Sequence, residues 1–400
     1  MFRLIPPAGA PISVSEISKI LRKRFSSDRS GEIFAEKIKE YTKTKHCILL
    51  NSGRTALLAI LKALNKMSDF KKNEVVMPAY TCFSVAAAVA RSGLKIRLID
   101  SDPDTLDYDY ERLNRVDFTA VLAIIGCNLF GILIDWNKLM SIAREKKVYL
   151  IDDAAQSMGS SFQRRPSGSL GDAGFFSLGR GKNLSVISGG ILLTDNDDVA
   201  SHLNEYMKEI NESNYFIEIK ATLNIIFYSL FLKPRLYWIP DKMPFLKLGQ
   251  TVFDENFKAG HLSTLQRCAA TVMFSRLDKV NAARVENARA LSSGLLNDDR
   301  YRIPGHDPNK YPIYLRLPVL ARNKLERDLA VAALKRKGIS ASAMYPSTIR
   351  QIEGIEKYLA GLNDRFDGAN AVVDRLFALP THPYVKPGDI DRIINCLKEI

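Results

Sequence analysis

The sequence has few of the residues that form disulfide frameworks or metal sites. Its cysteines are scattered without paired spacing, at Cys47, Cys82, Cys127, Cys268 and Cys396. This pattern argues against a disulfide framework and a zinc site, and it fits a reducing cytoplasm. The five histidines show no ligand spacing either. We therefore expect no bound metal.

Long apolar runs, leaders and repeats are also lacking. Residues 1–7 do not contain the apolar core of a signal peptide. The uncharged run from Ala221 to Leu232 is too short to cross a bilayer, which takes about 20 residues. No internal repeat or low-complexity tract is visible. With 400 residues, 46% of them hydrophobic, we expect a soluble globular chain of two domains.

Short apolar runs alternate with helical patterns, and this rhythm predicts an α/β fold with a mostly parallel central sheet and helices on both faces. The expected strands are 47–50, 74–77, 95–99, 120–125, 148–152 and 190–194, and the expected helices include 54–66, 83–92 and 135–146. After these, a strand over 311–317, a helix over 322–337 and a strand over 339–342 indicate a smaller α+β domain. We place the large domain at 1–250, with an insertion at about 205–250, and the small domain at 251–400.

One lysine stands out in a loop of small residues. Lys182 follows the apolar run that ends at Ser177, and about thirty residues upstream another run ends in Asp152-Asp153. A carboxylate that keeps a pyridine nitrogen protonated, together with a lysine that binds an aldehyde carbon, is what a pyridoxal phosphate site needs. The alternative is an ordinary solvated loop lysine.

A third segment lies near the start of the chain. Asn51-Ser52-Gly53-Arg54-Thr55 leads into an expected helix with one apolar face. Free backbone amides and the positive end of the helix dipole would suit a phosphate group there. The alternative is a plain Ser or Asn helix cap.

Together these segments resemble the DegT/DnrJ/EryC1/StrS family, sugar aminotransferases of the aspartate aminotransferase fold (fold type I). The resemblance runs from about residue 30 to the C-terminus. Its motifs are 74–81, 99–106, 153–156, 168–174, 182–184, Tyr345-Pro346 and 378–383.

The resemblance implies a role for each matching residue. Lys182 matches the lysine that binds pyridoxal 5'-phosphate covalently, Asp153 the partner of its ring nitrogen, and Gln156 the residue beside its phenolic oxygen. Gly53, Arg54, Thr55 and Ser177 match the phosphate cradle. The family also implies a homodimer in which a neighbouring subunit adds an asparagine to that cradle, and Asn256 is the best match for it.

Some positions depart from the family pattern. Cys82 stands where relatives often stack an aromatic ring on the cofactor, with Tyr80 and Phe83 beside it. Asn128 replaces a histidine and Ser188 replaces an acid. Because these positions face substrate in the family, they indicate an unusual substrate.

Residues 214–247 form an apolar and basic insertion. Its aromatic residues and its cations Lys233, Arg235, Lys242 and Lys247 would suit a helix lying in a membrane interface, and Pro234, Pro240 and Pro244 would break it into short pieces. The alternative is packing on the protein's own core or on a dimer partner.

The function that these observations predict is an aminotransferase that moves an amino group from glutamate to a nucleotide-linked keto-sugar for surface polysaccharide or glycolipid synthesis. The net charge of +13 fits anionic nucleotide sugars or an anionic membrane face. No nucleic-acid recognition motif is present, so we expect no nucleic-acid partner. We expect a cytoplasmic protein, with peripheral contact to the inner face of the membrane as the alternative location.

The alternatives for function are a sugar dehydratase of the same family, in which the lysine is replaced by histidine, and a catalytically silent membrane-associated regulator or scaffold.

Overall fold

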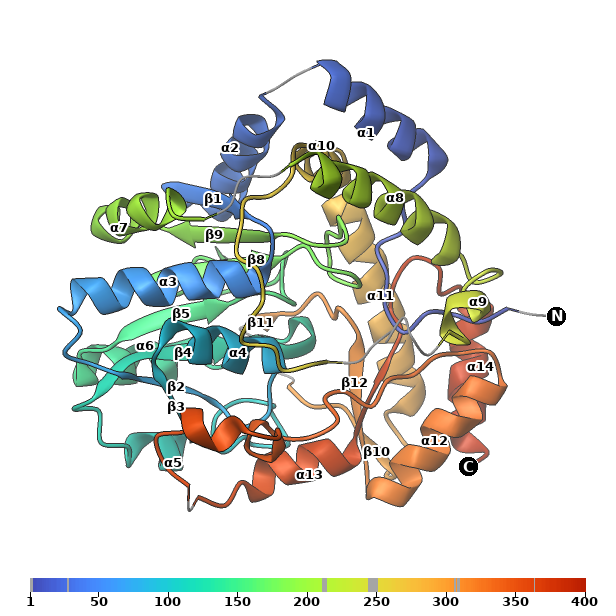
Figure 1. Cartoon of the computed structure of the whole chain (residues 1–400). Helices are drawn as coiled ribbons and strands as arrows, with labels where there is room; N and C mark the ends of the chain where they lie inside the picture. Colours follow the sequence, from blue (N-terminus) through green and yellow to red (C-terminus); the bar gives the residue numbers. More distant parts are fainter. Residues whose placement is uncertain are drawn as a thin grey trace.

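A computed structural model describes residues 3–26, 29–210, 214–243, 251–305, 307, 310–362 and 364–400. Seven strands form the central sheet in the order β1-β9-β8-β5-β4-β2-β3 (Figure 1). These are β1 His46–Leu50, β2 Glu74–Pro78, β3 Lys95–Ile99, β4 Val121–Cys127, β5 Tyr149–Asp153, β8 Ala173–Ser177 and β9 Gly190–Thr194. β9 runs antiparallel to β1 and β8, and the other pairs are parallel. The predicted fold class is confirmed.

Helices cover both faces of this sheet because its strands are apolar on both sides. Phe175 packs in the core cluster with α3 and α4, whereas Phe176 packs in the cluster with α2 and α10. The helices up to the insertion are α1 Val14–Ser26, α2 Ser30–Thr42, α3 Gly53–Met67, α4 Phe83–Ser92, α5 Tyr110–Asn114, α6 Trp136–Lys146 and α7 Asp197–Met207. The later ones are α8 Tyr215–Phe231, α9 Trp238–Asp241, α10 Thr264–Phe274, α11 Leu277–Leu295, α12 Lys324–Arg336, α13 Asp367–Arg375 and α14 Pro387–Lys398.

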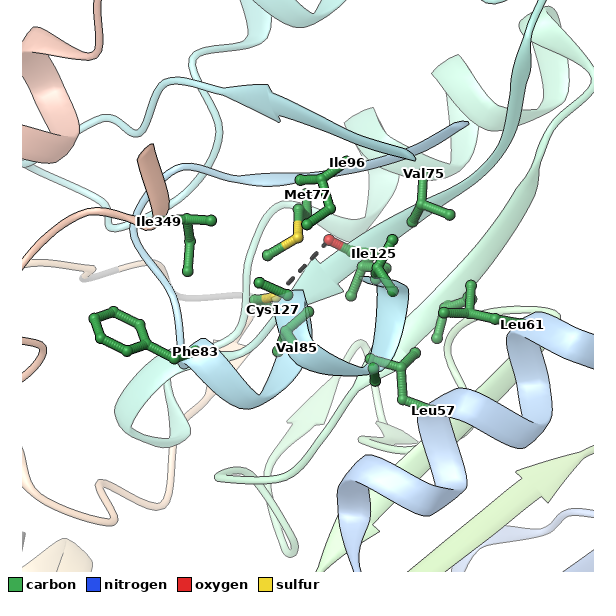
Figure 2. Packing of buried hydrophobic residues seen from close by; sticks show 14 of the residues in the cluster. Leu57, Leu61, Val75, Met77, Phe83, Val85, Ile96, Ile125, Cys127 and Ile349 are labelled. Atoms are coloured by element: carbon green, nitrogen blue, oxygen red, sulfur yellow. Dashed lines mark hydrogen bonds between the residues drawn. The ribbon is translucent and has the colours of Figure 1, made fainter. Parts of the chain in front are cut away.

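The largest core cluster lies between the sheet and helices α3 and α4. Figure 2 shows Leu57 and Leu61 of α3 turned toward Val75 and Ile125 of the sheet. Ile349, from far along the chain, joins the same cluster, and its N–H donates to the carbonyl of Ala79 at 2.9 Å. The C-terminal part of the chain is thus anchored on the large sheet.

A second sheet, of order β10-β12-β13, forms the core of the C-terminal part with α11, α12 and α14. Its strands are β10 Tyr301–Arg302, β12 Leu317–Ala321 and β13 Leu376–Leu379. A third small sheet joins β6 Ser161–Phe162, β7 Arg165–Pro166 and β11 Lys310–Tyr311.

Two strand predictions in the C-terminal part are wrong. Residues 311–317 do not form one strand, because Pro312 lacks a ladder donor and Tyr314 has a positive φ of 46°. β11 therefore ends at Tyr311, and β12 begins at Leu317. Residues 339–342 form isolated bridges from Ile339 to Ile5 and from Ser342 to Ala378 instead of a strand.

The hydrophobic clusters cross the predicted domain boundary at residue 250. Ile5 packs in the core of the C-terminal sheet, whereas Leu265 and Cys268 pack on the large sheet. The division into 1–250 and 251–400 stays a prediction.

Candidate active site

The predicted site residues lie at or just after the carboxyl ends of four strands of the central sheet. Ser52 follows β1, Cys82 follows β2, and Asp153 and Ser177 close β5 and β8. Ligands of open α/β sheets bind at this edge, where the strand ends and helix N-termini meet. The topology therefore brings the separate motifs to one place.

The start of α3 adjoins the end of β8. The Ser52 side chain caps α3 by accepting from the N–H of Thr55 at 3.1 Å. A Cβ added to Gly53 would lie 3.2 Å from the Cβ of Ser177. Only glycine allows this close approach without a shift, so the helix N-terminus and a strand-end hydroxyl form one cradle. The cap interpretation is confirmed, and the phosphate site stays a prediction.

Thr55 is buried, and its hydroxyl donates to the Asn51 Oδ1 at 2.6 Å. Arg54 points away from the cradle: its guanidinium is 3.4 Å from the Asp254 carboxylate and 4.8 Å from the Phe257 ring centroid. The structure thus gives Arg54 a partner within the protein, and no bound anion is needed to explain it.

Asn256 is exposed, and its N–H donates to Asp254 at 3.1 Å. Its segment lies on the α3 N-terminus of its own chain through the Arg54 contacts. The donation of Asn256 across a subunit interface stays a prediction.

Lys182 and Asp153 interact electrostatically, and each shifts the pKa of the other. Burial lowers the pKa of Lys182, and the negative charge of Asp153 raises it. Burial raises the pKa of Asp153, while the N–H of Ala155, at 3.0 Å, and Lys182 lower it. The nearby Cys127 thiol also lowers the pKa of Asp153. A partly neutral amine beside a buried carboxylate is the arrangement that amine chemistry on a pyridine cofactor requires.

Asp152 points to the opposite side of β5 and has a different environment. Its carboxylate accepts from Asn128 Nδ2 at 2.8 Å, from the N–H of Gly168 at 2.6 Å and from the N–H of Leu170 at 3.2 Å. Complete burial raises its pKa to about 7. Asp152 therefore anchors a loop, and Asp153 is the acid that faces Lys182.

Two buried tyrosines, Tyr80 and Tyr345, form hydrogen bonds with each other and with Gln156. Gln156 donates to the Tyr345 hydroxyl at 3.0 Å and accepts from the N–H of Phe130 at 3.2 Å. The Tyr80 hydroxyl accepts from the N–H of Tyr345 at 2.7 Å. Cys82 lies beside Tyr345 and Lys182, since it shifts the pKa of both. The contact of Cys82 with the cofactor stays a prediction.

Asn128 and Ser188, two of the residues that depart from the family pattern, form hydrogen bonds within the protein. The Asn128 Oδ1 accepts from the N–H of Ile134 at 3.3 Å and from the Trp136 indole at 3.2 Å. The Ser188 hydroxyl accepts from Gln266 Nε2 at 2.9 Å. These contacts are structural, so neither side chain is evidence for an unusual substrate.

Sequence reasoning missed Arg316. One of its Nη atoms is 3.6 Å from the position of a Cβ on Gly181, next to Lys182, and the other donates to the Met344 sulfur. Its Nε is buried and has no hydrogen-bond partner among the described residues. The available signal was a charged residue between apolar neighbours in Leu315-Arg316-Leu317.

Among the described residues, no group of three or more His, Cys, Asp or Glu side chains is arranged to hold a metal ion. In the same ranges, no helix has the length and apolar character needed to cross a membrane.

Comparisons with known proteins bear on this geometry. The model of the DegT/DnrJ/EryC1/StrS aminotransferase family matches residues 13–398. GDP-perosamine synthase of Caulobacter vibrioides is 32% identical over 170 residues, 42% of this chain and 45% of that protein. GDP-4-keto-6-deoxy-D-mannose 3-dehydratase of Yersinia pseudotuberculosis is 28% identical over 44% of this chain and 45% of its own length. This chain thus aligns with less than half the length of either relative.

Among solved structures, the PLP form of Spr1654 from Streptococcus pneumoniae matches with a TM-score of 0.78 and 19% identity, covering 99% of this chain and 98% of the other. This likeness shows the fold. The predictions of family, enzyme class and cofactor dependence are confirmed by the family match. The chain belongs to the DegT/DnrJ/EryC1/StrS aminotransferase family, which depends on pyridoxal 5'-phosphate.

Proposed function

We propose that this aminotransferase moves an amino group from glutamate to a nucleotide-linked keto-sugar, for surface polysaccharide or glycolipid biosynthesis. The observation that carries the proposal is the approach of Gly53 to Ser177 at the strand ends, together with the electrostatic interaction of buried Lys182 with Asp153. The names of the relatives, a perosamine synthase and a keto-sugar dehydratase, support a keto-sugar substrate.

The residues fit the cofactor. The close approach of Gly53 and Ser177 leaves backbone amides and a hydroxyl for its phosphate, and Asp153 is the carboxylate for its ring nitrogen. When bound, pyridoxal 5'-phosphate supplies a carbon that binds amines and a ring that accepts the electron pair of a broken C–H bond. Asp153 would keep the ring nitrogen protonated, and Gln156 would contact the phenolic oxygen, as the family resemblance implies.

Lys182 acts in both half-reactions. Its Nζ binds the cofactor at rest. With the cofactor bound, the free amine of Lys182 would remove a proton from the donor's α-carbon in the first half-reaction and would deliver a proton to the sugar carbon that becomes aminated in the second. Because burial lowers its pKa, a larger share of Lys182 is neutral near pH 7 and able to take a proton.

Arg316 would bind the carboxylate of the amino donor. It lies beside Gly181 and therefore close to Lys182, and its buried Nε has no partner among the described residues. A buried guanidinium gains most from an anionic ligand that completes its hydrogen bonds. The part of the site near Tyr80 and Tyr345 would then remain for the sugar.

The dehydratase alternative is less well supported because Lys182 is retained, whereas the relatives of that type are expected to carry histidine at this position. The regulator alternative is disfavoured by the intact pairing of Lys182 with Asp153. Either alternative would show itself by a lack of amino transfer.

The assembly belongs to the same proposal. We place the site in a cytoplasmic homodimer with Asn256 added to the partner's phosphate cradle, the large domain at 1–250 and the small domain at 251–400. Peripheral attachment to the inner face of the membrane through 214–247 is a separate part, because none of those residues is among the proposed catalytic ones.

The test uses the purified protein with pyridoxal 5'-phosphate, glutamate and a panel of nucleotide-linked keto-sugars. We expect a visible absorbance band that glutamate bleaches and a keto-sugar restores, with 2-oxoglutarate and an amino-sugar as products. A bleached band with a deoxygenated sugar product would favour the dehydratase. Absence of any band under saturating cofactor would favour the silent regulator.

A further inference from the structure

Helix α8 is apolar on two opposite sides. Its inner side chains Ala221, Ile225 and Ser229 are buried, and the helix packs there against α10 and α1. Tyr215, Phe216, Ile219, Leu223, Ile226, Phe227 and Leu230 are exposed, with Phe216 79% and Phe227 57% accessible. At 100° per residue, these seven fall within an arc of roughly 120° and along roughly 22 Å of helix. We call them the α8 stripe.

A soluble helix normally presents polar side chains on the face opposite the core, so an apolar stripe of this length marks an interaction surface. The stripe contains two phenylalanines and a tyrosine, and Phe227 stacks on Phe231 with ring centroids 5.7 Å apart. Aromatic side chains with polar neighbours favour the boundary between water and lipid.

Cations lie along one edge of the stripe and beyond its C-terminal end. Lys220 lies on α8 itself, and Lys233 and Arg235 follow its C-terminal end, all three exposed. α1 contacts α8 and carries exposed Lys19 and Arg22 (Figure 1). Arg24 of α1 is 4.0 Å from Glu218, and the N–H of Ala10, just before α1, donates to the Tyr228 hydroxyl at 3.1 Å. At 100° per residue, Glu218 and Tyr228 lie outside the arc of the stripe, so α1 packs on the side of α8 away from it.

The acids of these elements are engaged within the protein. The Glu218 carboxylate accepts from the N–H of Thr264 at 2.7 Å and of Leu265 at 3.0 Å. Glu16 pairs with Arg276 at 3.0 Å, and Asp241 pairs with Lys335 at 3.1 Å. The exposed surface around the stripe is therefore more basic than the composition of the segment implies.

We propose that the α8 stripe and its cations dock the protein on an anionic lipid bilayer, with α8 lying in the plane of the interface. In the part of the chain that the structure describes, no helix can cross the membrane, so the contact is peripheral. Pro244 and Lys247, which belong to the same insertion, lie outside the described residues. This inference does not depend on the aminotransferase chemistry.

A second copy of the chain is the competing occupant. In a twofold contact the same patch meets itself, so Lys220, Lys233 and Arg235 of one copy would approach those of the other. Like charges brought together oppose association, whereas anionic headgroups attract the same cations. Charge complementarity therefore favours the bilayer.

The test measures cosedimentation with phosphatidylcholine vesicles and with mixed phosphatidylcholine–phosphatidylglycerol vesicles. We expect wild-type protein to bind the mixed vesicles at low salt and to be released by high salt. Leu223→Glu and Phe227→Glu should each weaken binding about tenfold or more, because each removes an apolar side chain from the contact. Leu325→Glu, at a leucine on α12 that is 69% accessible against 52% for Leu223, should change nothing.

The charge contribution has its own pair of variants. Lys233→Gln and Arg235→Gln should each weaken binding about fivefold, whereas Lys398→Gln at the far C-terminus should not. Thermal unfolding and amino transfer should match wild type in all of these variants. Wild-type protein that stays in the soluble fraction with mixed vesicles at low salt would overturn the proposal. So would sedimentation velocity showing that Phe227→Glu separates a dimer into monomers.

Discussion

Asp153 and Asp152 are consecutive residues with opposite tasks. The Asp153 carboxylate faces Lys182 and lowers the cost of its positive charge, whereas the Asp152 carboxylate accepts three hydrogen bonds from Asn128, Gly168 and Leu170. Successive strand residues point to opposite faces, which separates the two acids although they are neighbours in the chain.

This separation predicts different outcomes for two similar variants. Asp153→Asn should retain cofactor and fold but lose amino transfer by about 10³-fold or more, because an amide does not keep the ring nitrogen protonated. Asp152→Asn should lower thermal stability instead, because an amide gives the N–H groups of Gly168 and Leu170 a weaker acceptor. Steady-state rates and melting curves check both. A rate loss confined to Asp152→Asn would reverse the assignment.

Lys182→Ala should abolish the visible absorbance band of the cofactor complex and cut amino transfer by about 10⁴-fold or more, since covalent binding and proton transfer are lost together. Lys182→Arg should fail as well, because a guanidinium stays protonated. Circular dichroism is the control for folding. Turnover in either variant near the wild-type rate would exclude Lys182 as the reacting amine.

Arg316→Met should raise the KM for glutamate about tenfold to a hundredfold, which corresponds to losing a charge-assisted hydrogen bond. The KM for the keto-sugar should change little, and Arg316→Lys should recover part of the donor affinity. Initial-rate kinetics with each substrate varied separately measure this. An equal loss for both substrates would indicate a structural role for Arg316.

His382 predicts a pH dependence of stability. It is completely buried, donates through Nε2 to the carbonyl of Pro6 at 2.8 Å and accepts at Nδ1 from the N–H of Tyr384 at 3.3 Å. Burial is the main cause that lowers its pKa from 6.5 to about 3.

Because the unfolded chain binds this proton more readily, the stability contribution of His382 is complete above pH 6.5 and is lost as the pH falls from 6.5 toward 3. The slope is about 1.4 kcal/mol per pH unit at most. Urea unfolding at several pH values should show a flatter acid limb in His382→Gln. His46→Gln, at a half-buried histidine that pairs with Asp197 at 2.8 Å, serves as the comparison. An unchanged acid limb in His382→Gln would show that other groups govern acid unfolding.

A shared active site predicts complementation. If Asn256 serves the partner subunit, mixing inactive Lys182→Ala with an inactive Asn256→Ala variant should restore up to about a quarter of the activity, because one of the two sites in half of the dimers is intact. Mass spectrometry of labelled chains should confirm subunit exchange. Exchange without recovery would place both residues in one chain's site or exclude Asn256 from it.

The sequence alone determined the family, the central α/β sheet and the positions of Lys182, Asp153 and Gly53. These follow from local features, namely apolar periodicity, small-residue turns and the order of motifs, and each depends on residues close together in the chain. The strand predictions at 311–317 and 339–342 failed because Pro312, the positive φ of Tyr314 and pairing with distant Ile5 outweighed the local pattern.

Only the tertiary structure decided how the site is completed. Arg316 lies next to Gly181, although more than a hundred residues separate them in the chain. The Asn128 amide hydrogen-bonds with Asp152 and Trp136, and the Arg54 guanidinium pairs with Asp254. The sequence likewise showed an apolar, basic insertion but not which of its faces is buried. These outcomes depend on which side chains long-range packing brings together, and a linear pattern carries no information about such distances.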